Sequence, residues 1–195
     1  MDIQFNNLRQ EKDAIGVVFC DNKCRLLGYG KKLDQLSKKY ISNIIKSDIS
    51  FQERNSKNFD YSIIHQPTNL KLSKLYVFKL KNFKDYQIRD FQVLGGHLNS
   101  LIKFYKETNV IVYPDGISSS KVGSLNAISE MILGMSLASY SFTKYFSKKD
   151  DKKNKNKTKK KKVKIYSSQH TRLAKNYESI SAIHQGVTLT RNLVT

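Results

Sequence analysis

The hydrophobic pattern predicts a strand, a helix and a second strand in the middle of the chain. Residues 74–80 (KLYVFKL) are aromatic and β-branched, as in a buried strand. From about residue 86 to 106, apolar residues recur at the three- and four-residue spacing of one helix face: Phe91, Leu94, Leu98, Leu101, Ile102 and Tyr105. Residues 109–113 (NVIVY) read as a strand that ends at Pro114-Asp115-Gly116. This order predicts a right-handed βαβ unit with parallel strands, covered by helices on both faces.

The rest of the chain continues the alternation of strands and helices. Further strands are predicted at residues 14–20, 61–65 and 163–166, and further helices at residues 31–46, 124–140 and 171–193. The polar residues 1–13 predict an edge strand or a loose arm, and residues 47–58 are expected to be irregular. We therefore expect one α/β domain with three layers, in which helices flank a mixed, mostly parallel sheet.

A lysine-rich stretch interrupts this domain. Residues 147–162 contain ten lysines, and no apolar residue lies between Phe146 and Val163. Such a stretch buries too little surface to offset its ordering entropy, so we expect a disordered loop there. The predicted organisation is an α/β core at 1–146, the loop at 147–162, and a final strand and C-terminal helix of the same domain at 163–195.

The net charge of +19 bears on possible partners. Lysine outnumbers arginine 29 to 6, whereas proteins that read nucleic-acid sequence usually employ arginine for forked contacts. Any binding to nucleic acid is therefore expected to be electrostatic and non-specific. The lysine run is interpreted as a solvated loop, with a polyanion-binding segment as the alternative.

The remaining bulk features predict a cytoplasmic protein. Cys20 and Cys24 are too few for a disulfide framework, and no His or further Cys lies near them in the sequence to complete a metal site. We therefore expect reduced thiols. The N-terminus does not resemble a signal peptide, and no apolar run approaches the roughly 20 residues of a membrane span. We expect no membrane association.

Glycine patterns offer two candidate features. Gly28-Tyr29-Gly30 precedes a predicted helix, as in phosphate-binding loops, but Leu33 stands where the third glycine of G-x-G-x-x-G would lie. A plain turn is the favoured interpretation and a nucleotide site the alternative. Gly95-Gly96 lies inside a predicted helix, and we expect it to serve close packing on the sheet rather than a ligand.

The histidines and serines do not assemble a catalytic or metal motif. His65, His97, His170 and His184 lack the spacing of a helical metal site. His97 and His184 lie among core positions, where we expect satisfied packing residues. Residues 118–120 (SSS) lack the G-x-S-x-G nucleophile elbow. We accordingly predict no catalytic, cofactor-binding or metal-binding residue in this chain.

Three stretches in order resemble the N-terminal domain of the leucyl (cytosol) aminopeptidase family. They are the strand at 74–80 followed by the Gly95-Gly96 helix, residues 129–145 (SEMILGMSLASYSFTKY), and residues 186–195 (GVTLTRNLVT). The last resembles the family's "G-V-x-L-A-R-D-L-V-N" helix, which leads into the catalytic domain. It departs from that pattern at Thr190, Asn192 and Thr195.

The resemblance implies a macro-domain-like fold, a cytoplasmic location and a family activity of releasing N-terminal residues from peptides. It also implies homohexamers and two divalent metal ions, manganese or zinc, held by the catalytic domain. The family's metal-ligand motifs, "V-G-K-G-x-x-F-D-S-G-G" and "N-T-D-A-E-G-R-L", do not occur in these 195 residues. Because metal-assisted hydrolysis needs those carboxylates, no catalytic residue carries over to this chain.

The favoured function is therefore that of a non-catalytic domain of a leucyl-aminopeptidase-type protein, which packs on a catalytic domain or forms oligomer contacts. The alternatives are a non-specific nucleic-acid-binding module and a macro-like domain with a nucleotide ligand. Along the last helix, one stripe is expected to pack on the domain: Leu173, Tyr177, Ile180, His184 and Val187. Leu189, Leu193 and Val194 lie off that stripe and are expected to form an exposed docking face.

Overall fold

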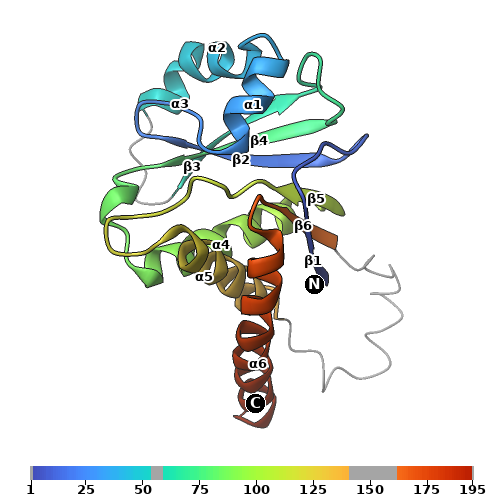
Figure 1. Ribbon diagram of the computed structural model, residues 1–195, viewed down its shortest axis with the longest axis vertical. Helices are drawn as coiled ribbons and strands as arrows, with labels where there is room; N and C mark the ends of the chain where they lie inside the picture. The colour runs from blue at the N-terminus through green and yellow to red at the C-terminus, as the bar shows by residue number, and fades with distance from the viewer. Residues whose placement is uncertain (1, 54–58, 141–161, 195) are drawn as a thin grey trace.

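The computed structural model describes residues 2–53, 59–140 and 162–194 and shows a six-stranded sheet between two layers of helices (Figure 1). The strands are β1 (Asp2–Asn6), β2 (Ile15–Asp21), β3 (Asp60–His65), β4 (Lys74–Leu80), β5 (Asn109–Val112) and β6 (Lys162–Tyr166). Their order is β1-β6-β5-β2-β4-β3, with every neighbouring pair parallel except β3 and β4. The predicted three-layer, mostly parallel α/β fold is confirmed.

The helices divide between the two faces of the sheet. One face carries α1 (Tyr29–Leu36), α2 (Tyr40–Ser47) and α3 (Ile49–Glu53), and the other carries α4 (Ile88–Phe104), α5 (Ser124–Ala138) and α6 (His170–Val194). A 3-10 turn at Phe83–Asp85 leads into α4. Strand β2 is buried along its whole length because it lies at the centre of the sheet and is covered on both faces.

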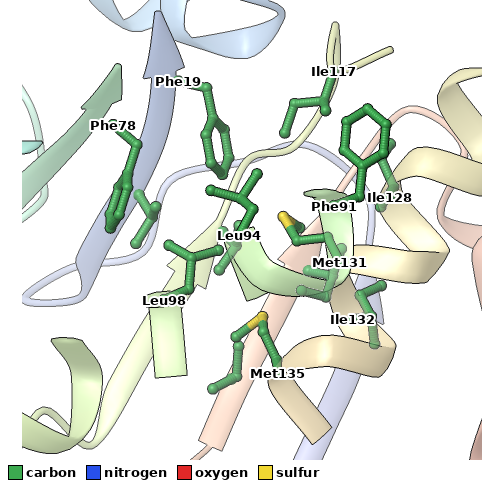
Figure 2. Packing of buried hydrophobic residues seen from close by; sticks show 14 of the residues in the cluster. Phe19, Phe78, Phe91, Leu94, Leu98, Ile117, Ile128, Met131, Ile132 and Met135 are labelled. Atoms are coloured by element: carbon green, nitrogen blue, oxygen red, sulfur yellow. The ribbon is translucent and has the colours of Figure 1, made fainter. Parts of the chain in front are cut away.

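The two faces of the sheet have separate hydrophobic cores. Alternate residues of one strand point to opposite faces, so Phe19 belongs to the core under α4 and α5, and Val18 to the core under α1 and α2. Figure 2 shows Phe19 and Phe78 from the sheet meeting Leu94 and Leu98 of α4. The larger of the two cores is thus formed by the central βαβ unit, to which α5 is added.

The central unit matches its prediction in all but one respect. Strand β4, helix α4 and strand β5 form where the pattern placed them, and the two strands run parallel. However, β2 lies between β4 and β5 and pairs with both. The crossover through α4 therefore spans one intervening strand, and residues from early and middle parts of the sequence share the sheet's centre.

The single helix predicted at 31–46 is wrong, because the chain breaks it into α1 and α2. Lys38 and Lys39 have φ angles of 53° and 62°, a left-handed conformation that no α-helix continues through. The Asp34 carboxylate accepts a hydrogen bond of 2.9 Å from the backbone N–H of Ser42 and so fixes the first turn of α2. The apolar periodicity is the same on both sides of the break and conceals it.

The segment 47–58, predicted to be irregular, contains the short helix α3. The Asp48 carboxylate caps it by accepting a 2.9 Å hydrogen bond from the N–H of Phe51. The Phe51 ring is 1% exposed and belongs to the core on the α1 side of the sheet. An N-cap residue three positions before a buried aromatic was the sequence signal for this helix.

The lysine-rich stretch lies almost wholly outside the described residues, so its predicted disorder is not tested. Lys162, placed in that loop by the sequence, is instead the first residue of β6. The predicted edge strand within residues 1–13 forms as β1, which pairs with β6. The helices predicted at 124–140 and 171–193 form with ends shifted by one or two residues.

Helices α4 and α5 cross so closely that two glycines are required. A Cβ on Gly95 would lie 1.9 Å from the carbonyl oxygen of Met131, and one on Gly134 would lie 1.9 Å from that of Gln92. Each glycine thus faces the backbone of the other helix. The expectation that Gly95 packs against the sheet is wrong, since its neighbour is α5, although close packing is the correct reason for a glycine there.

Gly95→Ala and Gly96→Ala form a matched pair that tests this crossing. A Cβ on Gly96 would meet only the Cβ of Ala138, at 3.9 Å, an ordinary contact. We predict that Gly95→Ala lowers the free energy of unfolding by about 2 kcal/mol or more, because two backbones must separate. Gly96→Ala should raise it by up to about 1 kcal/mol through helix propensity. Urea unfolding followed by circular dichroism measures both; equal effects of the two substitutions would contradict the close crossing.

Candidate functional site

Ligands of open α/β sheets usually bind where neighbouring strands send their connections in opposite directions. Here that point lies between the carboxyl ends of β2 and β5, because β2 connects towards β3 and β4 whereas β5 connects towards β6. The loop with Gly28 follows β2 and the loop with Asp115 and Gly116 follows β5. A ligand of this sheet is therefore expected between these two loops.

The two loops touch backbone to backbone at this point. Gly28 has a φ of 46°, and a Cβ there would lie 1.8 Å from the carbonyl oxygen of Asp115. Gly116 has a φ of 89°, and its Cβ would lie 2.8 Å from the nitrogen of Gly28. The Asp115 carboxylate accepts hydrogen bonds from the Ser167 hydroxyl and, at 2.9 Å, from the Ser168 N–H. Gly28 therefore serves loop packing, which favours the turn over the phosphate-binding interpretation.

A buried cation that the sequence did not reveal lies near the same end of the sheet. Lys79 is 2% exposed, donates a hydrogen bond to the Phe51 carbonyl and lies 4.7 Å from the centre of the Phe51 ring. Its ammonium is 4.0 Å from the Asp60 carboxylate, which also pairs with Lys81 at 2.8 Å. These contacts attach α3 to the sheet, so Lys79 has a structural role here.

Both cysteines are buried free thiols close to Lys79. Cys20 pairs with Lys79 across strands β2 and β4. Burial raises the pKa of Cys20 and of Cys24, so both remain protonated thiols at neutral pH. A protonated, buried thiol is a poor nucleophile, so neither cysteine is a catalytic candidate.

The loop between β1 and β2 is held to the sheet by a second charged group. The Glu11 carboxylate accepts hydrogen bonds from the Lys164 ammonium and the Tyr166 hydroxyl, and the Arg9 guanidinium lies 5.6 Å from the Tyr166 ring centre. Burial acts to raise the pKa of Glu11, but Lys164, Tyr166 and Arg9 together outweigh it and lower that pKa. These contacts hold the loop between β1 and β2 against β6.

The pH dependence of Glu11→Gln tests this attachment. A carboxyl whose pKa is lowered on folding adds stability above its unfolded pKa, and this is lost as the pH falls through its folded value. We predict that Glu11→Gln costs about 1 kcal/mol at pH 7 and almost nothing at acidic pH, where wild type also loses the ion pair. Urea unfolding at a series of pH values, from pH 7 downward for as long as the protein stays folded, measures this difference. A cost that does not fall as the pH is lowered would contradict it.

The histidines lie apart from one another. His97 packs edge-on to the Phe59 ring at 5.3 Å, which confirms its predicted packing role. His184 is half-buried, and burial lowers its pKa, but its Nδ1 has no hydrogen-bond partner among the described residues, so the expectation of a satisfied histidine is wrong there. Over residues 2–53, 59–140 and 162–194, no three His, Cys, Asp or Glu side chains gather in a group that could hold a metal ion.

Helix α6 is packed on the domain along its first half, whereas its second half leaves apolar side chains exposed. Its first half packs on the domain: Leu173 and Ile180 are buried, and the Tyr177 ring lies 5.3 Å from that of Phe5 on β1. Asn176 donates a 3.2 Å hydrogen bond to the Ser129 hydroxyl on α5. The predicted packing stripe is confirmed for its first three residues, with α5 and β1 as the neighbours of the helix, whereas His184 and Val187 are only half-buried.

The second half of α6 extends away from the body of the domain (Figure 1). Ile183, Leu189 and Leu193 are 53%, 61% and 74% exposed. The predicted exposure of Leu189 and Leu193 is thereby confirmed, while the side chain of Val194 lies outside the described residues. Leu189 and Leu193 lie one turn apart on the same side of the helix, and Ile183 is displaced around it. We call these three exposed residues together the α6 face.

Charge is scarce around the α6 face. From residue 179 to 194, Arg191 is the one Lys, Arg, Asp or Glu residue, although such residues make up 26% of the chain. The Arg191 guanidinium itself turns back to the domain, where it lies 5.4 Å from the Tyr140 ring centre and donates to the Leu137 carbonyl at 3.4 Å. An exposed helix with apolar side chains and almost no charge has the composition of a protein interface rather than of a solvated surface.

Comparison with known proteins yields structural neighbours and no sequence relatives. No protein-family model matches the chain, and no curated protein matches its sequence. A mutant of tomato leucine aminopeptidase is similar over 100% of this chain and 38% of its own, with a TM-score of 0.65 and 15% identity. The match is to the N-terminal region of that enzyme. The chain thus spans well under half of the tomato protein's length.

Two macrodomains are similar over almost their whole length. A mutant macrodomain from Oceanobacillus iheyensis matches with a TM-score of 0.57 and 10% identity, covering 92% of both chains. The macrodomain of Mycobacterium tuberculosis DarG matches with a TM-score of 0.53 and 10% identity, covering 85% of this chain and 98% of its own. The fold is macrodomain-like. At these identities the likeness establishes the fold alone.

The helices also bear on membrane association. Within the described parts of the chain, no helix combines the length and the apolar character needed to cross a membrane. Although α6 has 25 residues, its mean composition is too polar for a bilayer. The exposed apolar side chains of α6 are confined to one end of the helix.

Proposed function

We propose that this chain is a non-catalytic domain of a leucyl-aminopeptidase-type protein, and that it acts by docking a catalytic domain on the α6 face. In this proposal it has a structural role, and the divalent metal ions and the peptidase chemistry belong to the docked domain. We further propose a cytoplasmic location, in keeping with the buried, reduced thiols.

The observation that carries the proposal is the α6 face together with the likeness to the tomato enzyme. The whole of this chain corresponds in fold to 38% of that enzyme, which therefore has a large further part. The α6 face lies at the distal end of the chain's last helix and exposes three large apolar residues. Covering each is worth roughly 1.5–3 kcal/mol, which is enough to hold a partner domain.

The likeness to macrodomains alone would fit a nucleotide-binding role equally well. Two features weigh against that alternative. Between the carboxyl ends of β2 and β5, Gly28 lies against the backbone of Asp115 and Gly116, and the Asp115 carboxylate is already engaged by Ser167 and Ser168. Neither feature bears on the α6 face, so the docking role is the better supported of the two.

The purified chain is predicted to lack aminopeptidase activity. The carboxylate ligands that would hold two metal ions are absent from its sequence, so no bound water can be activated in the family's manner. Hydrolysis of leucine p-nitroanilide with added manganese or zinc measures this, with tomato leucine aminopeptidase as the positive control. Turnover that depends on metal and stops with a chelator would contradict the proposal.

A second prediction concerns the α6 face directly. Without its partner domain, the chain should bury this face by self-association at high concentration. Changing Leu189 and Leu193 together to Ser should shift the chain to monomer. Because both side chains are exposed, the circular dichroism spectrum and the unfolding midpoint should stay unchanged at a low concentration at which wild type is also monomeric. Sedimentation velocity measures the shift.

The matched control for that experiment uses exposed apolar residues on the opposite helical layer. Leu36 on α1 and Ile49 on α3 are 45% and 66% exposed, and their joint change to Ser should leave self-association as in wild type. A wild type that stays monomeric at high concentration, or an equal effect of both double variants, would show that the α6 face is not an interface.

A further inference from the structure

A hollow lined by aromatic rings lies between the edge strand β3 and helix α4, distant in sequence from the α6 face. Its volume is about 360 Å³. The lining residues are Phe59, Tyr61, Phe78, His97, Ser100, Leu101 and Phe104. Five of these seven side chains are rings, so the walls offer π faces and ring edges rather than branched aliphatic groups.

The floor and walls of this hollow are held in place before any ligand arrives. Phe78 is 1% exposed, and its ring lies 5.8 Å from that of Tyr61 and 6.1 Å from that of Phe19. The imidazole of His97 lies 5.3 Å from the Phe59 ring at an interplanar angle of 69°. Because each wall ring is supported by a second ring, little side-chain ordering remains to be done on binding.

The rim of the hollow carries a solvent-exposed aromatic ring, that of Phe104. Phe104, at the end of α4, is 77% exposed, and its neighbour Tyr105 is 36% exposed. The two rings stand edge to face at 5.0 Å, so Phe104 has one support and an open face. A ligand in the hollow would cover apolar ring surface that water now contacts.

The chemistry of the lining defines the ligand. Among the described residues that line the hollow there is no Lys, Arg, Asp or Glu, so they offer no ion-pair partner for a charged group. Polar atoms are few: the Ser100 hydroxyl already donates to the Gly96 carbonyl at 3.0 Å, and the Tyr61 hydroxyl lies 3.5 Å from that of Tyr105. A volume of about 360 Å³ is at the small end of ligand pockets.

From these features we propose that the hollow between β3 and α4 is a binding site for an uncharged planar aromatic group of one or two fused rings. The ring packs on Phe59 and Tyr61, above the buried Phe78, and is covered at the rim by Phe104. Offset and edge-to-face contacts between aromatic rings give a preference over an aliphatic ring of the same size. This site shares no residue with the α6 face and does not depend on the proposed docking function.

The test follows the ring signals of Phe and Tyr by NMR in the full chain during titration with indole. We expect saturable shifts of the Phe59, Tyr61, Phe78 and Phe104 rings, with a dissociation constant of about 1 mM for so small a ligand. Cyclohexanol is the aliphatic comparison and should bind more weakly. Absence of shifts up to about 20 mM indole, or equal binding of cyclohexanol, overturns the proposal.

Two variants and a matched control locate the site. Phe104→Ala should weaken indole binding by about two- to tenfold, the value of one ring–ring contact, and Ser100→Trp should abolish it by filling the hollow. Both residues are exposed, so the fold is expected to persist. Ile88→Ala, at the opposite end of α4 and 51% exposed, should leave binding unchanged. Equal binding by Phe104→Ala and wild type overturns the proposal even if Ser100→Trp does not fold.

A second titration distinguishes an aromatic side chain of a peptide from a free small molecule as the ligand. N-acetyl-L-tryptophanamide carries the same ring between two peptide groups. If it binds as tightly as indole, the site accepts an aromatic side chain of a peptide; if indole alone binds, the site is limited to free small molecules. The Leu189→Ser, Leu193→Ser double variant should bind indole as wild type does, so failure here is distinguishable from failure of the docking proposal.

Discussion

The close crossing of α4 and α5 is the constraint on which the rest of the structure depends. Gly95 and Gly134 let each helix touch the backbone of the other, and this places both helices on the same face of the sheet. With α4 set in this way, Leu94 and Leu98 reach Phe19 and Phe78 of the central strands. A wider crossing would separate these layers and open a cavity in a core that is otherwise closely packed.

The position of α6 follows from that crossing. Helix α6 packs on α5 and on β1, so α5 has to be held against α4 before the first half of α6 has a surface to cover. The second half of α6 then extends past the domain with no element of the described chain beneath Leu189 and Leu193. The close packing of α4, α5 and the first half of α6 thus both holds the core together and leaves the end of α6 uncovered.

Much of this fold could be predicted from the sequence, because periodicity of apolar residues reports burial directly. Strand β4, helix α4 and strand β5 follow from it, as do the packed positions Leu173, Tyr177 and Ile180 on α6. The break between α1 and α2 could not be found in this way, since Lys38 and Lys39 adopt left-handed angles for which no glycine gives a warning. Likewise, the partner of Gly95 is a helix rather than the sheet, and a one-dimensional pattern does not say which backbone approaches a glycine.

Of the two proposed binding surfaces, only the one on α6 could be predicted from the sequence. The exposure of Leu189 and Leu193 was predictable, because both lie on the side of the last helix away from Leu173, Tyr177 and Ile180. The ring-lined hollow was not, because Phe59 lies just before β3, Phe78 on β4 and Phe104 at the end of α4. These residues meet only through the pairing of β3 with β4 and the packing of α4 on the sheet. Buried Lys79 was missed for a related reason: its partners Asp60 and Phe51 are distant in sequence.

The central claim is that the outer half of α6 is an interface that the free chain leaves uncovered. Amide hydrogen exchange of the purified chain at low and at high protein concentration tests it most directly. We predict that protection of residues 181–194 rises with concentration, while that of β2 and β4 stays the same, because self-association covers the helix end alone. Protection of residues 181–194 that does not change with concentration would contradict it.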